Sequence, residues 1–420
     1  MKRAVVITLG CKVNDVESGS LISGLEALGY EVSRELGPAE LYVVNTCAVT
    51  REAERKSRQT VSKALHENPT ARVIVCGCAS EKNPTSFAEK DERVVAVLGT
   101  KRKGKILEIA GREFDERLPR VQIEKEEIGF EELPLPKRLK TRDFIKIQDG
   151  CNRFCSYCVI PYLRGRSRSR SLESVVKEAF ASTAYEVVLT GIDISDYKDG
   201  NGNTLRELML ALKDARPRIR LGSLEVGLIT PAFLAALKEV KNFAPHFHLS
   251  LQSGSNSVLK SMNRHYTREE YLEKCRMIYD VFPFAAITTD IIVGFPTETE
   301  EAFLESLSIV DEAGFAQVHA FPYSPREGTN AYRRYKELPA AVKKGRVERM
   351  LKKAAEGRKR YLEGLTGQTF TVVPETYENG FTDGYTENYI RVYLEGKMGK
   401  EPIQVRVQGE FRDGVKGERI

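Results

Sequence analysis

Six short apolar segments alternate with helix-length stretches between residues 141 and 335, and this repeat constrains the fold more than any other feature. The segments span residues 144–147, 185–189, 218–221, 246–251, 286–293 and 317–321. Regular alternation of strand and helix predicts a parallel sheet, which six repeats curl into most of a (β/α)6 barrel of the TIM type. The functional groups of such barrels lie at the carboxyl ends of the strands.

Three cysteines directly follow the first of these segments, in the sequence Cys151-Asn-Arg-Phe-Cys155-Ser-Tyr-Cys158. A CxxxCxxC loop offers three thiolates to a cubane iron–sulfur cluster, so one iron stays open to chelate a small molecule. The spacing therefore indicates a catalytic cluster rather than an electron-transfer cluster. Structural zinc sites use paired CxxC knuckles, and no second knuckle lies nearby in the sequence.

The first 130 residues alternate in the same way and predict an α/β domain of the flavodoxin-like kind. Strands are expected at residues 3–9, 41–44 and 72–76, and helices at residues 14–28 and 51–66. A linker is expected at residues 124–140, where the composition turns acidic, then proline-rich, then basic.

Each of these three strands is followed closely by a cysteine, Cys11, Cys47 or Cys78. Because the carboxyl ends of neighbouring parallel strands meet at one edge of a sheet, the three thiols are expected to converge. One hypothesis is a second three-thiolate cluster site. The other is three unrelated buried cysteines, since cramped strand ends favour small residues. Cys76 lies inside its strand and is expected to be a core thiol.

Length and composition fit a protein of two or three domains, each with its own core, in a chain of 420 residues. The N-terminal apolar run is too short for a signal peptide, and no segment approaches a membrane span. Eight cysteines in groups favour metal ligation in a reducing compartment, so we expect a cytoplasmic protein without a membrane partner. The formal net charge of +6 permits a nucleic-acid partner without demonstrating one.

The last segment, residues 365–420, follows a basic helix expected at residues 338–365 and differs in character from the rest of the chain. Apolar residues alternate with tyrosines and an arginine at residues 389–394, and glycines punctuate the segment, which predicts a small antiparallel β-barrel. Tyr389 and Arg391 are candidates to stack on or pair with RNA. A solvated strand face explains these two residues equally well.

Residues 151–158, including Tyr157 before the last cysteine, resemble the signature of the radical S-adenosylmethionine (SAM) superfamily. Three further motifs, in order, make nearly the whole chain resemble the methylthiotransferase family: Thr8-Leu-Gly-Cys11-Lys-Val-Asn14, Val44-Asn-Thr-Cys47-Ala-Val49 and Gly77-Cys78-Ala79. The resemblance implies a methylthiotransferase N-terminal domain at residues 1–130, a radical SAM domain at 141–360 and an RNA-binding TRAM domain at 365–420.

The same resemblance implies SAM and two 4Fe-4S clusters as cofactors. Cys151, Cys155 and Cys158 are expected to hold the radical-forming cluster, and the auxiliary cluster that presents sulfur is expected on Cys11, Cys47 and Cys78. Candidate SAM contacts are Tyr157 and residues at the ends of the barrel strands, namely Thr190, Gly191, Ser223, Glu225, Gln252, Gly294 and Tyr323. Each strand-end residue is equally compatible with a turn at the barrel rim.

Four alternating arginines, Arg164, Arg166, Arg168 and Arg170, follow the cysteine loop. We interpret most of this ladder as a phosphate-binding strip for RNA. Arg166 or Arg168 is an alternative partner for the SAM carboxylate, and a solvated strip is the plainer alternative.

The arginine motif, the Thr8–Asn14 motif and Ser223-Leu-Glu225 most resemble the branch that methylthiolates carbon 2 of N6-threonylcarbamoyladenosine at tRNA position 37, in two SAM-dependent steps. Isopentenyladenosine in tRNA and an aspartate of a ribosomal protein are alternative substrates within the family. A non-enzyme alternative is an RNA-binding protein with structural zinc. The implied partners are tRNA, an electron donor such as flavodoxin or ferredoxin, and a sulfur donor of unknown identity.

Overall fold

The computed structural model describes residues 2–112, 119–137 and 141–420, so residues 138–140 of the predicted linker lie outside the described residues. The chain divides into two compact units. Unit 1 comprises Met1–Lys137, Lys146–Arg170 and Ser324–Arg333, and unit 2 comprises Arg138–Ile145, Ser171–Tyr323 and Arg334–Ile420. The division into domains at 1–130, 141–360 and 365–420 stays a prediction.

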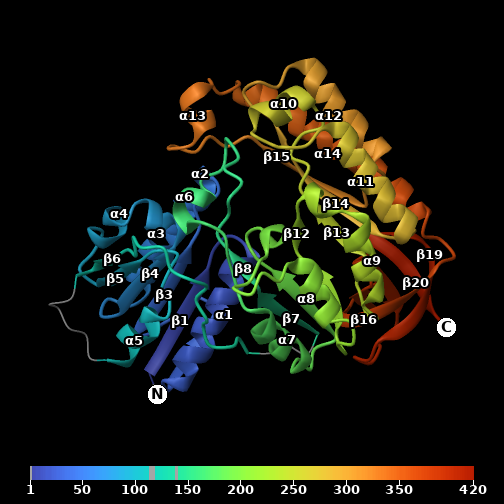
Figure 1. Ribbon diagram of the computed structural model, residues 1–420. Coiled ribbons are helices and arrows are strands. Elements are labelled where there is room, and N and C mark those ends of the chain that lie inside the picture. The colour runs from blue at the N-terminus through green and yellow to red at the C-terminus, as the bar shows by residue number, and fades with distance from the viewer. Residues whose placement is uncertain (1, 113–118, 138–140) are drawn as a thin grey trace. The chain divides into compact units, whose positions relative to one another are not determined.

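Unit 1 is built on a parallel sheet in the order β2-β1-β3-β4-β5-β6 (Figure 1), the flavodoxin-like order for its first five strands. The strands are β1 (Lys2–Thr8), β2 (Tyr30–Ser33), β3 (Leu41–Thr46), β4 (Arg72–Gly77), β5 (Val94–Leu98) and β6 (Val121–Gln122). The helices are α1 (Lys12–Ala27), α2 (Arg51–Glu67), α3 (Cys78–Lys82), α4 (Thr85–Ala88) and α5 (Lys105–Gly111). β1, β3, β4, α1 and α2 confirm the predicted elements, whereas β2, β5 and β6 had not been predicted.

Helices cover both faces of this sheet, and each face has its own apolar core. On one face, Val61 of α2 packs in a cluster that includes Val75 of β4. On the other face, Leu21 of α1 packs in a cluster that includes Ile74 and Cys76. Cys76 has no exposed surface, which confirms its prediction as a core thiol.

Residues 146–170 of unit 1 form a short hairpin that carries the cysteine loop. β8 (Gln148–Asp149) pairs antiparallel with β9 (Arg168–Ser169), and α6 (Ile160–Arg164) lies between them in the sequence. The CxxxCxxC loop therefore begins directly after β8 and ends just before α6. A further short helix, α13 (Asn330–Arg334), begins in the last segment of unit 1.

Unit 2 contains the strands predicted from the long alternation, in the predicted sequence order. One sheet has the order β11-β10-β7 and the other β12-β13-β14-β15, and every pair described in the second sheet is parallel. The strands are β7 (Arg142–Lys146), β10 (Glu186–Thr190), β11 (Arg218–Leu221), β12 (Ser223–Leu224), β13 (His246–Leu249), β14 (Ala286–Val293) and β15 (Gln317–Pro322). This arrangement confirms the α/β class.

Helices connect these strands, as the alternation predicts. They are α7 (Leu172–Phe180), α8 (Leu205–Ala211), α9 (Pro231–Glu239), α10 (Asn256–Ser261), α11 (Arg268–Val281) and α12 (Glu300–Glu312), with two short 3-10 turns, η1 (Ile194–Asp196) and η2 (Val226–Leu228). α11 begins at a capping box in which Thr267 accepts a hydrogen bond from the Glu270 amide (3.2 Å). Cys275 of α11 is buried in the core.

The last connection is α14 (Ala340–Glu363), the basic helix that the sequence predicts. Its charged residues keep it polar despite its 24 residues. Nowhere in the described part of the chain is a helix both long enough and apolar enough to cross a membrane.

A closed five-stranded barrel ends the chain and confirms the predicted small β-barrel. Its strands are β16 (Thr369–Glu378), β17 (Phe381–Tyr385), β18 (Arg391–Glu395), β19 (Ile403–Phe411) and β20 (Gly414–Arg419). All pairs are antiparallel except β18 with β20. Its core joins Phe370 and Val392 of the barrel to Ala286 at the start of β14 and Leu362 of α14.

Gly384→Ala is expected to destabilise the terminal barrel. A Cβ at this position of β17 would stand 2.3 Å from the Val373 carbonyl oxygen of the neighbouring strand, so the two strands must separate. Overpacking of this kind costs about 1–3 kcal/mol of the free energy of unfolding. Urea denaturation followed by circular dichroism measures the loss.

Gly399→Ala is the matched control, because no atom lies within 4 Å of a Cβ at that position. It should leave the free energy of unfolding within about 0.5 kcal/mol of the parent. Equal effects of the two substitutions would contradict the close approach of β16 and β17.

Candidate functional site

Cys11, Cys47 and Cys78 follow β1, β3 and β4, which are direct neighbours in the sheet of unit 1. The carboxyl ends of these strands lie at one edge, because Thr46 of β3 pairs with Gly77 of β4. A Cβ on Gly10 would stand only 2.6 Å from the sulfur of Cys47, so the turn that carries Cys11 packs directly against Cys47. The structure therefore brings the three sequence-predicted cysteines to one edge.

The turn from β4 into α3 is fixed by a glycine and by a side chain of β3, the neighbouring strand in the sheet. Gly77 has a φ of +102°, and a Cβ there would stand 2.4 Å from the Thr46 carbonyl oxygen. The Thr46 hydroxyl donates to the Cys76 carbonyl (2.6 Å) and accepts from the amides of Ala79 and Ser80 (both 3.2 Å). β3 thereby caps the helix that begins with Cys78.

Two of the three thiols lie in surroundings that disfavour ionisation. Burial raises the pKa of the Cys78 thiol to about 11 against the opposing effect of Arg164, and burial likewise raises the pKa of Cys47. The Cys11 sulfur raises both pKa values further, because a thiolate there would repel a second negative charge. Such a set fits a cationic iron–sulfur group, because metal binding displaces the thiol protons together.

The CxxxCxxC loop is anchored to the segment that follows α6. The Cys151 amide donates to the Gly165 carbonyl (3.2 Å), and the Cys158 amide donates to the Cys155 carbonyl (3.0 Å). Gly150 has a φ of +73°, and a Cβ there would stand 2.0 Å from the Arg166 carbonyl oxygen. The three cysteines are half-buried, so the loop presents thiols at a surface while its backbone is fixed.

Within residues 2–112, 119–137 and 141–420, no three His, Cys, Asp or Glu side chains form a group suited to a single metal ion. The thiolates of a 4Fe-4S cluster bind different irons and therefore stand further apart than the ligands of one ion. The ligands of a 4Fe-4S cluster therefore need not form a group of that kind.

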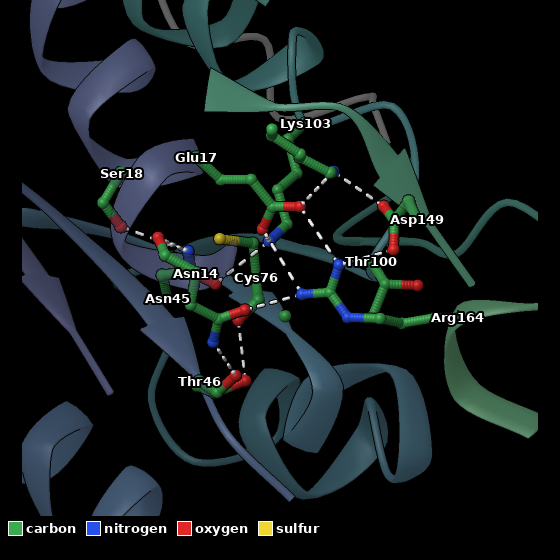
Figure 2. Close-up of polar contacts among 12 residues, drawn as sticks. Asn14, Glu17, Ser18, Asn45, Thr46, Cys76, Thr100, Lys103, Asp149 and Arg164 are labelled. Carbon is green, nitrogen blue, oxygen red and sulfur yellow. Dashed lines mark hydrogen bonds and ion pairs between the residues drawn. The ribbon is translucent and has the colours of Figure 1, made fainter. Parts of the chain in front are cut away.

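A buried network of charged side chains surrounds Glu17 of α1 in unit 1 (Figure 2). Arg164, at the end of α6, has no exposed surface. Its Nη1 donates to Asp149 (2.8 Å) and Glu17 (3.1 Å), and its Nη2 donates to the Asn14 side-chain oxygen (2.6 Å). One guanidinium therefore joins α1, β8 and α6.

Two lysines complete the shell around Glu17. Lys103 donates to the Glu17 carboxylate and to the side-chain oxygen of Asn45 (3.1 Å). Lys146 donates to Glu17 (2.6 Å) and to Asp149 (2.7 Å). Figure 2 shows Lys103 and Arg164 approaching Glu17 from separate segments of the chain.

Both carboxylates of the network are ionised at neutral pH. Burial works to raise the pKa of Glu17, but Arg164, Lys103 and Lys146 outweigh it and hold this pKa below its ordinary value. Burial likewise works to raise the pKa of Asp149, but Arg164, Lys146 and Arg168 hold this pKa well below its ordinary value. These six side chains include four cations and two anions, so the network carries excess positive charge.

Most candidate SAM residues lie in unit 2 at the carboxyl ends of its strands. Thr190 ends β10, Gly294 follows β14 and Tyr323 follows β15. Gln252 has a φ of +68° and pairs with β14, since its amide donates to the Asp290 carbonyl (2.9 Å). Gly191 follows Thr190, Ser223 is exposed in β12, and Tyr157 is half-buried in the cysteine loop of unit 1. Their SAM contacts stay predictions.

Two of these candidates have intramolecular contacts of their own. Glu225 accepts a hydrogen bond from the guanidinium of Arg264, which also donates to the Ser250 carbonyl (3.1 Å). A Cβ on Gly294 would stand 2.5 Å from Lys343 Cγ, and its φ is +70°, so packing against α14 already requires glycine there. The rim-turn interpretation thus explains Gly294 as well as a SAM contact does.

The predicted RNA-binding strip is wrong for Arg164 and Arg170. Arg164 is fully buried in the network, and Arg170 is buried with its Nε donating to Glu132 (2.9 Å). Arg168 donates to Asp149 (3.0 Å) and is half-buried. Arg166 alone of the four is exposed, with its guanidinium 4.7 Å from the centre of the Phe154 ring.

Tyr389 and Arg391, the candidate RNA contacts of the terminal barrel, are also engaged within the chain. The Arg220 guanidinium lies 3.8 Å from the centre of the Tyr389 ring, and the His246 ring packs against the same tyrosine at 5.3 Å. Arg391 donates to Asp383 (2.7 Å) and to Asp413 (3.0 Å). Both residues remain half-buried, and their RNA contacts stay predictions.

Sequence reasoning missed Glu17, Lys103 and Lys146 as members of the site. No spacing rule connects Glu17 with the two lysines, because they lie 86 and 129 residues further along the chain. A weak signal was available for Asp149, which directly precedes the cysteine loop, and for Asn14, which belongs to the Cys11 motif.

Two family models match this chain, one at its N-terminal end and one in its central part. Residues 3–99 match the family described as "Uncharacterized protein family UPF0004", and residues 145–310 match the Radical SAM superfamily. The radical SAM methyltransferase TsrM from Kitasatospora setae, solved with cobalamin and a [4Fe-4S] cluster bound, has a TM-score of 0.53 at 16% identity. It covers 77% of each chain, which supports the fold alone.

Curated relatives match along nearly the full length. The threonylcarbamoyladenosine tRNA methylthiotransferase MtaB of Bacillus subtilis is 37% identical and covers 93% of this chain and 89% of its own. The MtaB of Aquifex aeolicus is 37% identical, and the match covers 94% of this chain and 97% of that protein. The tRNA-2-methylthio-N(6)-dimethylallyladenosine synthase of Staphylococcus haemolyticus is 32% identical, and the match covers 97% of this chain and 85% of that protein.

Glu17→Gln is expected to lower the free energy of unfolding at pH 7 by about 3–5 kcal/mol, because it leaves buried cations with one anion fewer. The pKa of Glu17 is lowered in the folded state, so its contribution is present above pH 4.5. It is lost as the pH falls below that value. Urea denaturation at pH 7 and at lower pH measures both effects.

The same substitution at Glu31, in an exposed ion pair with Arg3 (3.3 Å), is the control. Because solvent screens that pair, Glu31→Gln should cost roughly 0–1 kcal/mol at any of these pH values. A Glu17→Gln variant as stable as Glu31→Gln would refute the importance of the buried network.

Proposed function

Because this chain belongs to the radical SAM methylthiotransferase family, we propose that it transfers a methylthio group to an adenosine of tRNA. One observation carries the proposal. Cys11, Cys47 and Cys78 follow three adjacent parallel strands of the same unit that contains the CxxxCxxC loop. A radical SAM enzyme that only cleaves SAM needs one set of three thiols, whereas sulfur insertion gives a use to the second set.

In this proposal Cys151, Cys155 and Cys158 hold one 4Fe-4S cluster, and Cys11, Cys47 and Cys78 hold another. When bound, the clusters and SAM supply a radical that removes hydrogen from carbon 2 of the adenine, and the sulfur and methyl group that replace it, in two SAM-dependent steps. The number of clusters is part of the proposal, and anaerobic analysis of iron and acid-labile sulfide per chain tests it.

The chain's own residues orient these groups. Thr46 and Gly77 fix the turn that carries Cys78, and Gly150 fixes the start of the radical SAM loop. SAM is proposed to bind near Thr190 and Gln252 at the carboxyl ends of the parallel strands, where the fold class binds ligands. Arg166, the exposed arginine of the ladder, is the proposed partner for the SAM carboxylate or an RNA phosphate.

We propose N6-threonylcarbamoyladenosine at position 37 of tRNA as the substrate. The Bacillus subtilis and Aquifex aeolicus relatives are named for that nucleoside, and they share more identity with this chain than the Staphylococcus haemolyticus relative does. The name of the latter makes isopentenyladenosine the second candidate. An electron donor such as flavodoxin or ferredoxin, a sulfur donor and a cytoplasmic location complete the proposal.

Loss of this protein from its cell is expected to remove one methylthio nucleoside from tRNA. Mass spectrometry of tRNA nucleosides should find N6-threonylcarbamoyladenosine in place of its 2-methylthio derivative, and re-expression should restore the derivative. Loss of the isopentenyl derivative instead would select the second candidate. Unchanged tRNA nucleosides with a changed ribosomal-protein aspartate would overturn the tRNA proposal.

Substitutions in the two cysteine sets are expected to have different effects. Cys158→Ala should abolish formation of 5′-deoxyadenosine from SAM, because it removes a ligand of the radical-forming cluster. Cys78→Ala should retain 5′-deoxyadenosine formation and lose the methylthio product. Chromatography of the small molecules and mass spectrometry of the tRNA measure the two outcomes.

Cys275→Ala is the control, because this thiol is buried in α11 of unit 2 and is assigned to neither set. It should retain the iron and sulfide content of the parent. If Cys78→Ala behaved like Cys275→Ala, the assignment of an auxiliary cluster to Cys78 would be wrong.

A further inference from the structure

The buried network of unit 1 reaches the backbone that carries the CxxxCxxC loop. Asp149 immediately precedes Gly150 and stands two residues before Cys151. One oxygen of its carboxylate accepts both from the Gly150 amide (2.8 Å) and from the Arg164 guanidinium (2.8 Å). Arg164 thus holds the start of this loop through a single shared carboxylate.

The same guanidinium reaches the other cysteine set through Asn14. The side-chain oxygen of Asn14 accepts from Arg164, while its amide nitrogen donates to the carbonyls of Leu9 (2.8 Å) and Thr46 (3.0 Å). Leu9 precedes the turn to Cys11, and Thr46 directly precedes Cys47. Arg164 is therefore separated from both cysteine sets by one side chain each.

Stability alone gives a poor account of this network. Burying charged groups carries a desolvation penalty that their mutual attraction often fails to offset, and an apolar core of similar volume is frequently at least as stable. A buried arginine does supply a rigid, planar fork of donors with fixed directions. In this unit the fork is shared among Asn14, Glu17 and Asp149, which belong to α1 and β8.

We infer that Arg164 is a positioning residue whose guanidinium sets the separation and orientation of the two cysteine sets, so that the groups they hold act on the same substrate atom. The inference rests on the proposed function, which needs both sets. It assigns to Arg164 a role distinct from the phosphate contact that its place in the arginine ladder predicts.

Arg164→Lys tests the inference, because lysine keeps the positive charge but is a point donor that cannot span three acceptors in a plane. Iron and sulfide per chain and 5′-deoxyadenosine formation should stay at parent values. The methylthio product formed per 5′-deoxyadenosine should fall about 100-fold, the loss that a displacement of about 1 Å produces. Magnetic coupling between the two reduced clusters, read by electron paramagnetic resonance without substrate, should change.

Arg93→Lys is the matched control. The Arg93 guanidinium lies in the same unit and donates to Asp91 (2.7 and 2.9 Å) and to the Leu65 carbonyl (2.8 Å), away from the network. This variant should retain the product ratio and the magnetic coupling of the parent. A parent-like ratio and parent-like coupling in Arg164→Lys would overturn the inference.

Asn14→Asp is the second test variant, for use if Arg164→Lys fails to fold. It keeps an acceptor for Arg164 but removes the amide that donates to Leu9 and Thr46, so the same two readouts should shift in the same direction. If the parent makes no methylthio product yet holds two clusters, the proposed function fails, and the magnetic coupling alone decides the inference. If the parent protein holds only one cluster, both the proposed function and the inference about Arg164 are wrong.

Discussion

The parallel pairing of β1, β3 and β4 is the constraint on which the rest of unit 1 depends. Parallel strands end at the same edge, so Cys11, Cys47 and Cys78 meet there although long stretches of sequence separate them. The edge is crowded enough that Gly10 and Gly77 have no room for a side chain. This crowding leaves the loops few alternative conformations, and the thiols keep their places through backbone geometry.

Much of this arrangement could be predicted because its signals are local. Val5, Val43 and Val75 belong to apolar runs that are each followed within three residues by a cysteine, and an apolar run of that length indicates a buried parallel strand. β2 is only four residues long and half polar, so its sequence carries no comparable signal. The fully buried β5 does carry an apolar run, but periodicity does not distinguish such a run from a piece of buried helix.

The arginine ladder could not be interpreted correctly from the sequence, because burial depends on partners distant in the chain. Arg164 and Arg166 look equivalent in a repeating basic motif. In the structure Arg164 ends α6 and is neutralised by Glu17, which comes 147 residues earlier, whereas Arg166 lies in the exposed turn that follows. Arginine at every second position predicts a single strand with all four side chains on one face. In the structure the first arginine belongs to α6, so the four side chains do not share a face.

The terminal barrel of unit 2 shares its core with the strands before it. Phe370 and Val392 pack in one cluster with Ala286 of β14 and Leu362 of α14, and Tyr389 lies against Arg220 of β11. A small terminal domain on a flexible tether can be exchanged between proteins as a unit. This one cannot, because its removal would leave the amino ends of the parallel strands without their apolar cover. Sequence changes that leave this shared core intact are therefore confined to the outward-facing loops and strand faces of the barrel.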